Sequence, residues 1–362
     1  MSDKTSIIFV VDPPGLVVDG LLLLSSLRKH MPDIDIVPYC PAEKKELLPP
    51  QVVEFFNHYN APIQFMETKG QFSPAYKQGN KLLAAATPRD TDATIFLDTD
   101  IIITQPFRPD EVIASGCLSA APEGRYTWGK APDMWPSAYA TFGMEVPEER
   151  INLAKSNALS PPYFNAGVVA YENRTPSGED FSELWLRTAK EIDNNPAVIG
   201  RRPWLDQISL PIAMARAGLK TNLLEKKWNL SLTHSATKPT LPDYKNRQYQ
   251  TIIDGLNAAD PVIAHYHNHG ALNSLRYGAI AKDLIAEFTC YDSVQTLRED
   301  MVGKSITKGE VMAEFHKLKA IKERTPEEQK RFSVVNTMKR EFQAKKRGHN
   351  LYANWPDSLL PN

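Results

Sequence analysis

The sequence predicts an α/β protein with a mostly parallel sheet and helices on both faces, followed by a helical carboxyl-terminal extension. Two observations predict this class. The first part of the chain contains short, unbroken apolar segments rich in β-branched and aromatic residues, which is typical of strands buried on both faces. Segments of helical length separate these strands, and this alternation indicates a parallel sheet covered by helices.

The first strand is expected over residues 6–11 (SIIFVV), and the helix-breaking sequence DPPG of residues 12–15 ends it. A helix is expected over 17–29. No lysine follows Gly20 and no G-x-G-x-x-G motif is present, so this first turn is not a glycine cradle for phosphates. The alternation then continues with strands over 34–37 and 63–66, helices over 52–58 and 73–86, and a strand that begins at Ile95.

The pattern loosens over residues 106–162, which are rich in proline, glycine and aromatic residues. Two interpretations stay open here: a surface excursion with its own small cluster, or an insert that recognises an acceptor. A strand returns over 163–171, and Gly167 inside it marks the close approach of a ligand or of another backbone. Later elements are expected as helices over 181–194 and 203–218 and an apolar strand over 261–270.

The composition changes after about residue 290. Residues 317–347 hold eleven lysines or arginines against four glutamates, with helical spacing. We therefore expect two parts, a main domain over residues 1–290 and a basic helical extension over 291–362. Such a charged helix face is usually only solvated, and binding of a partner or of an anionic surface is the alternative.

The bulk properties exclude several classes of protein. The formal net charge of −1 predicts no general attraction to nucleic acid or anionic lipid. Cys40, Cys117 and Cys290 are isolated, so neither a zinc ribbon nor a disulfide framework is indicated, and a reducing compartment fits. Neither a signal peptide nor a transmembrane segment is evident, and we expect a cytoplasmic protein. A homo-oligomer is possible.

Two carboxylates, Asp98 and Asp100, lie one residue apart between the apolar runs IFL and III. Charges in such surroundings are costly unless something compensates them. The carboxyl end of a buried strand is where α/β sheets bind ligands, and hard cations such as Mg²⁺ and Mn²⁺ prefer carboxylate oxygens. A plain Asx turn is the alternative. An EF-hand loop is excluded, because Ile102 and Ile103 occupy positions that need a polar residue and a glycine.

Further motifs follow in order along the chain: Phe164-Asn165-Ala166-Gly167-Val168, Asp206-Gln207, Trp228-Asn229 and His265-Tyr266. Together with Asp98-Thr99-Asp100, this ordered set resembles the GT-A-fold glycosyltransferases, whose sheet is Rossmann-like. It resembles most closely glycosyltransferase family 8, to which glycogenin and the bacterial lipooligosaccharide galactosyltransferases belong. The resemblance covers residues 5–275. One departure is clear, since the family's late Lys-Pro-Trp phosphate clamp is missing and Arg276 is the nearest cation.

The resemblance implies a metal-dependent hexosyltransferase. The donor is expected to be a nucleotide-diphosphate sugar, taken as UDP-linked, and the acceptor is an unidentified glycan, small molecule or protein. Asp98, Asp100 and His265 are the expected ligands of Mn²⁺ or Mg²⁺, and this mixed oxygen and nitrogen set suits Mn²⁺. The metal would neutralise the charge of the diphosphate leaving group.

The same resemblance implies roles for the remaining motif residues. Asp206, Gln207 and Asn165 are the expected catalytic residues, and Asp206 would bind sugar hydroxyls or stabilise positive charge at the anomeric carbon. The expected donor- and acceptor-binding residues also include Lys81 or Arg276 for the phosphates, Val11 and Asp12 for the base or ribose, and Thr99, Ala166 and Gly167. Each has a plain structural alternative: a first-turn aspartate answering the helix dipole for Asp206, a turn for Asp12, and a strand irregularity for Asn165 and Gly167.

Two alternatives from other functional classes stay open. His265, His267 and His269 alternate, so on a strand they would share one face, and three histidines with a water form a catalytic zinc site. A histidine-ligated metal hydrolase would follow, although no H-E-x-x-H motif accompanies these residues. The second alternative is a non-catalytic nucleotide-sugar-binding protein whose basic extension recruits a partner.

Overall fold

The computed structural model describes residues 4–234, 241–302, 308–343 and 355–361. Within this part of the chain, a seven-stranded central sheet has the order β10-β6-β9-β4-β1-β2-β3. Only β9 runs antiparallel to its neighbours β4 and β6, so the predicted mostly parallel α/β sheet is confirmed. The strands are β1 (Thr5–Val10), β2 (Asp35–Pro41), β3 (Gln64–Met66), β4 (Ala93–Leu97), β6 (Cys117–Pro122), β9 (Phe164–Glu172) and β10 (Lys220–Leu223).

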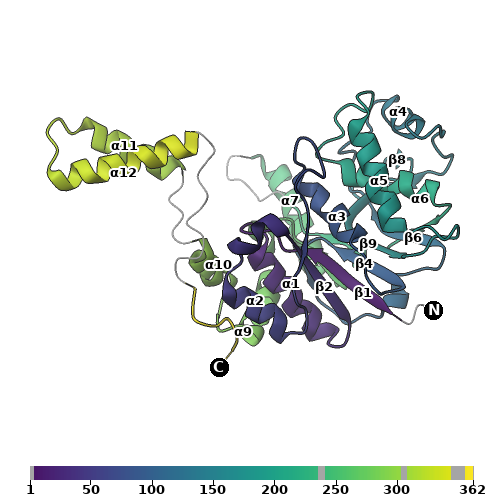
Figure 1. The fold of residues 1–362 in the computed structure, drawn as a ribbon, viewed down its shortest axis with the longest axis horizontal. Helices are drawn as coiled ribbons and strands as arrows, with labels where there is room; N and C mark the ends of the chain where they lie inside the picture. The colour runs from purple at the N-terminus through teal and green to yellow at the C-terminus, as the bar shows by residue number, and fades with distance from the viewer. Residues whose placement is uncertain (1–3, 235–240, 303–307, 344–354, 362) are drawn as a thin grey trace.

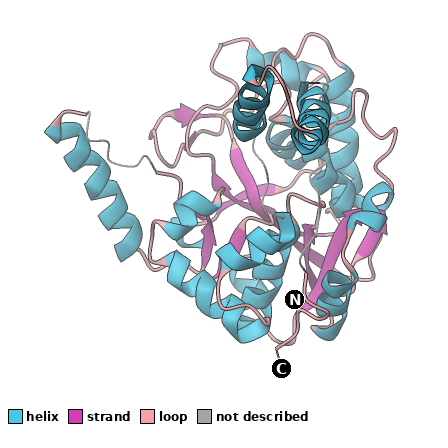
Figure 2. Cartoon of the chain, turned by 90° about the vertical axis from the view of Figure 1, so that its left-hand side faces the viewer, coloured by secondary structure: helices cyan, strands magenta, loops and turns pink. Residues whose placement is uncertain are grey.

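Helices cover both faces of this sheet, as Figures 1 and 2 show. The reason lies in the alternation of β1, whose Ile7 and Phe9 join one apolar cluster while Ile8 and Val10 join the other. The first cluster contains α1 (Val17–His30), α2 (Pro50–His58), α9 (Tyr277–Phe288) and α10 (Val294–Val302). The second contains α3 (Asn80–Ala86), α4 (Met134–Ala140), α5 (Phe181–Asn194) and α6 (Leu205–Arg216).

A smaller sheet lies beside the central one and has the order β11-β12-β5. Its strands are β11 (Leu230–Ser231), β12 (Ile263–His265) and β5 (Ile101–Ile103), with η4 (Lys226–Trp228) before β11 and α7 (Asp243–Ala258) before β12. Only the tripeptide Asp98–Asp100 separates β4 of the central sheet from β5 of the smaller sheet. The two aspartates therefore lie at the seam between the sheets.

The segment 106–162 is more than a surface excursion. It supplies β6, a strand in the interior of the central sheet between β9 and β10. It also buries Trp128, Trp135 and Tyr139 in the second apolar cluster. The remaining elements of this segment are η3 (Pro109–Glu111), α4, β7 (Ile151–Asn152) and β8 (Leu159–Ser160).

Two predicted elements are shorter in the structure. The helix expected over 73–86 is reduced to η2 (Lys77–Gly79) and α3, because Pro74 and Gly79 interrupt it. Another short 3-10 turn, η1 (Ala42–Leu47), follows β2. The strand expected over 261–270 ends at His265, and α8 (His269–Asn273) begins soon after. The prediction that the three histidines share one strand face is therefore wrong.

The carboxyl-terminal region is helical, as predicted. Helices α11 (Lys308–Ala320) and α12 (Pro326–Gln343) pack against each other through a small apolar cluster of their own and stand away from the sheets (Figure 1). By contrast, α10 and the fully buried Leu359 belong to the main core. The division at residue 290 stays a prediction. No helix in the described ranges is long and apolar enough to cross a membrane.

Candidate active site

Three strands hold the tripeptide Asp98-Thr99-Asp100 in place. The backbone N–H of Asp98 donates to the carbonyl of Gly167 in β9 (2.8 Å), and the Thr99 hydroxyl donates to the carbonyl of Val10 in β1 (2.5 Å). The carbonyl of Asp100 accepts from the backbone N–H of Tyr266, just after β12 (3.0 Å). The two carboxylates therefore have a fixed position at the carboxyl ends of β1 and β4.

His265 meets these carboxylates from the smaller sheet. Its Nε2 lies 3.1 Å from Asp100 Oδ1 and 3.9 Å from Asp98 Oδ2. A β-carbon on Gly167 would lie only 2.5 Å from Cε1 of His265, so glycine is required there. The prediction for Gly167 was the close approach of a ligand or of another backbone, whereas the group that approaches is the imidazole side chain of His265.

A chain of hydrogen bonds fixes the tautomer of His265. The backbone N–H of Gly167 donates to one side-chain atom of Asn165 (3.1 Å), which must therefore be the oxygen Oδ1. Asn229 Nδ2 donates to the same oxygen (2.8 Å). Hence Asn229 Oδ1 is the atom that faces His265 Nδ1 (3.1 Å) and accepts its hydrogen. In the neutral imidazole, Nε2 then directs a lone pair toward Asp100.

A lone pair and a carboxylate oxygen 3.1 Å apart require a cation between them, either a proton or a metal ion. For the protonated form, burial lowers the pKa of His265, but the charges of Asp100 and Asp98 outweigh it and the pKa is raised. Burial opposes ionisation of Asp100 too, yet His265 holds its pKa well below the usual range. Burial raises the pKa of Asp98 despite its ion pair with Lys81. Ligand atoms of Asp100, His265 and His267 lie within 4.8 Å of one another, so these residues fit a metal ion.

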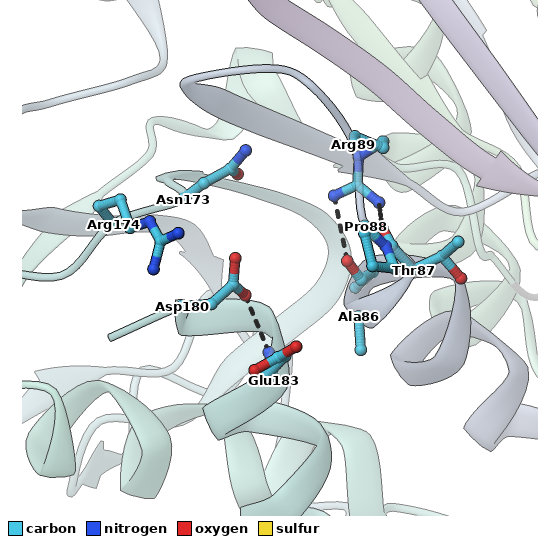
Figure 3. A pocket seen from close by; sticks show the side chains of 9 residues that line it. Ala86, Thr87, Pro88, Arg89, Asn173, Arg174, Asp180 and Glu183 are labelled. Atoms are coloured by element: carbon cyan, nitrogen blue, oxygen red, sulfur yellow. Dashed lines mark hydrogen bonds between the residues drawn. The ribbon is translucent and has the colours of Figure 1, made fainter. Parts of the chain in front are cut away.

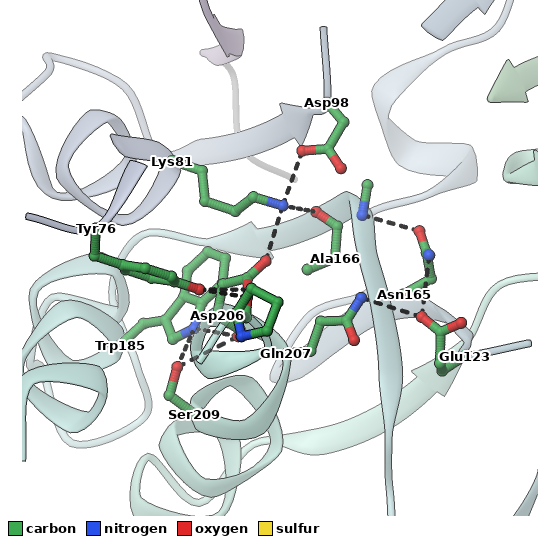
Figure 4. A network of polar contacts seen from close by, with 12 residues as sticks. Tyr76, Lys81, Asp98, Glu123, Asn165, Ala166, Trp185, Asp206, Gln207 and Ser209 are labelled. Atoms are coloured by element: carbon green, nitrogen blue, oxygen red, sulfur yellow. Dashed lines mark hydrogen bonds and ion pairs between the residues drawn. The ribbon is translucent and has the colours of Figure 1, made fainter. Parts of the chain in front are cut away.

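Lys81 lies between Asp98 and Asp206 and pairs with both carboxylates (Figure 4). Its Nζ lies 2.8 Å from Asp98 Oδ1 and 2.9 Å from Asp206 Oδ2, and it donates to the carbonyl of Ala166 (3.3 Å). Burial alone would lower the pKa of Lys81, but the two carboxylates raise it above its ordinary value. The Tyr76 hydroxyl lies 3.2 Å from the other oxygen of Asp206, and its single hydrogen is shared with the carbonyl of Pro203 (2.7 Å). Asp206, in the first turn of α6, is thus held from both sides.

Gln207 is held equally firmly. The Tyr163 hydroxyl donates to Gln207 Oε1 (3.0 Å), and Gln207 Nε2 donates to Glu123 Oε2 (3.1 Å). The same Glu123 oxygen accepts from Asn165 Nδ2 (3.1 Å), so Glu123 connects Gln207 to the chain that orients His265 (Figure 4). The sequence reasoning missed Glu123, because the strand β6 that ends beside it was not predicted.

Asp12 lies at the end of β1, and its side chain is only 1% exposed. Lys44 pairs with Oδ1, while Oδ2 is buried without a hydrogen-bond partner and lies 3.8 Å from Lys77 Nζ. The side chain of Val11 is buried in the core. A contact of Val11 with a substrate would therefore have to use its backbone.

Arg276 is the predicted residue that the structure does not bring to this cluster. Its guanidinium donates to the carbonyl of Ala259 (2.6 Å) and lies 3.5 Å from Asp260. Both residues precede β12, whereas His265 ends it. His269 is also turned away, since its Nε2 pairs with Asp19 (2.8 Å). Of the two predicted phosphate-binding cations, only Lys81 lies among the other site residues.

The structure also has a separate polar pocket, whose lining side chains Figure 3 shows. It is lined by residues that include Arg89, Arg174, Asp180 and Glu183. Another lining residue, Asn173, lies at the amino end of β4, where its backbone N–H donates to the carbonyl of Asp92. The pocket is therefore distinct from the cluster around Asp98, which lies at the carboxyl end of the same strand.

Comparison with known proteins decides between the functional classes. Residues 7–218 match the family described as the Rhodobacterales glycosyltransferase domain. The chain belongs to this glycosyltransferase family. The predicted glycosyltransferase is thus confirmed, and it is favoured over the hydrolase and over the non-catalytic binding protein. No curated protein matches the chain.

Solved structures of glycosyltransferases resemble this one at the level of the overall fold. A galactosyltransferase LgtC with donor and acceptor sugar analogues is 16% identical, with 77% of this chain and 95% of that chain covered and a TM-score of 0.42. Mouse xyloside xylosyltransferase 1 is 11% identical (74% and 98% covered, TM-score 0.45). The bifunctional WbbM is 14% identical (TM-score 0.41); 73% of this glycosyltransferase matches only 46% of that longer chain.

Proposed function

We propose that this glycosyltransferase is metal-dependent and moves a hexose from a UDP-linked sugar to a glycan, small-molecule or protein acceptor. One observation carries the proposal: the Nε2 lone pair of His265 faces Asp100 across 3.1 Å, a position for a proton or a metal ion, in a group of ligand atoms that fits a metal. Asp98, Asp100 and His265 would hold Mn²⁺ or Mg²⁺, since hard to borderline cations accept oxygen and imidazole nitrogen together. When bound, the metal supplies neutralisation of the charge on a diphosphate leaving group.

Lys81 and Asp206 would act on the sugar side. Asp206 has one oxygen on Lys81 and the other on the Tyr76 hydroxyl, so its position is fixed before substrate arrives. A preorganised carboxylate stabilises positive charge that develops at an anomeric carbon, because it need not reorganise at that moment. Lys81 keeps Asp206 and Asp98 at a constant separation and adds positive charge beside the phosphates.

Gln207 and Asn165 would position groups and not take protons. Both amide groups are held through Glu123, so their remaining hydrogen-bonding capacity has a fixed direction. Oriented amides of this kind recognise sugar hydroxyls. Oδ2 of Asp12 is buried without a hydrogen bond, with Lys77 Nζ at 3.8 Å, and is an acceptor that an N–H of a base or an O–H of a ribose would satisfy. This supports the assignment of the nucleotide to the end of β1.

The test is thermal unfolding with UDP and Mn²⁺ together, followed by measurement of UDP release from a panel of nucleotide sugars. Binding to the folded state at a hundred times the dissociation constant adds about 2.7 kcal/mol and raises the melting temperature. We expect this rise in the wild type and in Asp90→Ala, whose aspartate lies on the surface, but not in Asp100→Ala. No rise in the wild type with any nucleotide and metal would refute the proposal.

A further inference from the structure

We propose that His267 is an additional ligand of the same metal ion, so that the site presents two imidazoles and two carboxylates. This inference rests on the proposed metal dependence. A ring nitrogen of His267 lies within 4.8 Å of ligand atoms of both Asp100 and His265. The two imidazole rings stack at 3.8 Å between centroids and an angle of 29°. Because a metal ion lies in the plane of the ring that binds it, one imidazole must turn out of this stack for both to reach the same ion.

The backbone at His267 supports a functional reason for the residue. Its φ is +58°, in the left-handed region that histidine enters only at a cost of about 1–2 kcal/mol. The N–H of Asn268 donates to the carbonyl of Tyr266 (2.6 Å) and closes a tight turn around His267. Glycine or asparagine would adopt this conformation more readily. The turn directs an exposed imidazole over the buried ring of His265.

The hydrogen bonds of His267 leave one nitrogen free for a metal. The Ser231 hydroxyl accepts from Lys155 Nζ (2.9 Å) and donates its single hydrogen to Thr233 (3.3 Å). With that hydrogen on Thr233, the remaining lone pair of Ser231 accepts from Nε2–H of His267 (3.0 Å). Nδ1 keeps its lone pair. Metal-bound histidines commonly donate their other ring N–H to an outer partner in this way, as His265 does to Asn229.

A second imidazole changes which ion the site prefers. Affinity of nitrogen-containing sites rises from Mn²⁺ to Co²⁺, whereas oxygen ligands suit Mg²⁺ and Mn²⁺. With His267 as a ligand, the site should bind Co²⁺ much more tightly than Mn²⁺. Without it, three protein ligands of mainly oxygen character would separate the two ions less.

The experiment is calorimetric titration of metal-free protein with Co²⁺ and with Mn²⁺. His267→Gln removes the imidazole, and His267→Asn removes it while suiting the left-handed backbone, so this variant keeps the fold. His58→Gln, on the surface at the end of α2, is the matched control. We expect both His267 variants to lose Co²⁺ affinity by at least about tenfold and to lose less for Mn²⁺. The visible absorption of bound Co²⁺ should change as well.

Co²⁺ affinity and absorption equal to the wild type in both His267 variants would overturn this inference alone, and the site of Asp98, Asp100 and His265 would stand. Absence of binding by either ion to the wild type, with UDP present as well as without it, would instead remove the metal dependence itself, and the inference with it. Loss of affinity in His58→Gln equal to that in the His267 variants would also contradict the inference, because it would show binding to surface histidines.

Discussion

The substitution Gly167→Ala tests the geometry of the site directly. The added β-carbon would lie 2.5 Å from His265 Cε1 and 2.7 Å from its Nδ1. It would also lie 2.9 Å from Asn165 Oδ1, so the neighbours on both sides of the histidine's hydrogen bond are affected. Gly167 lies in β9, where its carbonyl accepts from the backbone N–H of Asp98, but on the β6 side it lies at a register shift between the pairs Ala120–Val169 and Ala121–Asn165.

Either the imidazole or the backbone at this irregularity must therefore move, and we consider the imidazole. Restoring an ordinary contact of at least 3.4 Å displaces the ring by about 0.9 Å. Overpacking of this kind costs about 1–3 kcal/mol of unfolding free energy. A displacement of about 1 Å in a positioned catalytic group costs about a hundredfold in rate. We expect a loss of unfolding free energy and a loss of turnover rate of these sizes, together with weaker metal binding.

Urea unfolding of the metal-free protein measures the first loss, and UDP release at saturating donor measures the second. Gly255→Ala is the matched control, because a β-carbon at this position in α7 meets nothing within 4 Å. Since alanine is the better helix former, that control should gain about 0.5–1 kcal/mol. A Gly167→Ala protein with wild-type stability and turnover would refute the reasoning, since His265 would then not depend on the absence of that β-carbon.

Three further predictions concern the same cluster. Lys81→Met leaves two buried carboxylates without their cation, so we expect a loss of about 3–5 kcal/mol in urea unfolding; Lys4→Met, on the surface, should change it by less than about 1 kcal/mol. Asn229→Ala removes the acceptor that orients His265, and metal affinity measured by calorimetry should fall about 10- to 100-fold; unchanged affinity would contradict the deduced tautomer. In the metal-free protein, the raised pKa of His265 contributes stability that is full below pH 6.5 and lost as the pH rises through the folded pKa. The lowered pKa of Asp100 contributes stability above pH 3.8 that is lost in stronger acid. Burial lowers the pKa of His267 to about 3 and raises the pKa of Asp98, and both shifts act in the opposite direction. The test is therefore the difference in urea midpoint between the wild type and Asp100→Asn, which should be largest inside this window.

The fold class was predictable because its strongest signals are local. The run SIIFVV and the apolar segment before Asp98 are buried on both faces, so their composition alone identifies them as strands. Strand β6 has the sequence CLSAAP, with no β-branched or aromatic residue. Its state is set by pairing with β9 and β10, and propensity could not reveal it.

The candidate site was predictable only as a set of motifs. Asp98, Lys81 and Asp206 come together as the resemblance implied. Glu123 and Asn229 orient their neighbours across separations of 42 and 64 residues from Asn165, and no spacing in the sequence reports such bonds. The turn at His267 was missed for a related reason. An apolar run into alternating histidines indicates a strand, whereas the left-handed residue that ends it has no glycine to mark it.

The position of Asp98–Asp100 between two sheets has a consequence for how the molecule moves. The tripeptide is the covalent link from β4 to β5, and β12 reaches back to it through the backbone of Tyr266. An ion held there would add a further link between the small sheet and the large one, beside the apolar core that they share. Amide hydrogen exchange in β5 and β12 should then slow on loading, while exchange at the distant β3 edge stays the same. The ion would thus suppress local opening of the small sheet as well as take part in sugar transfer.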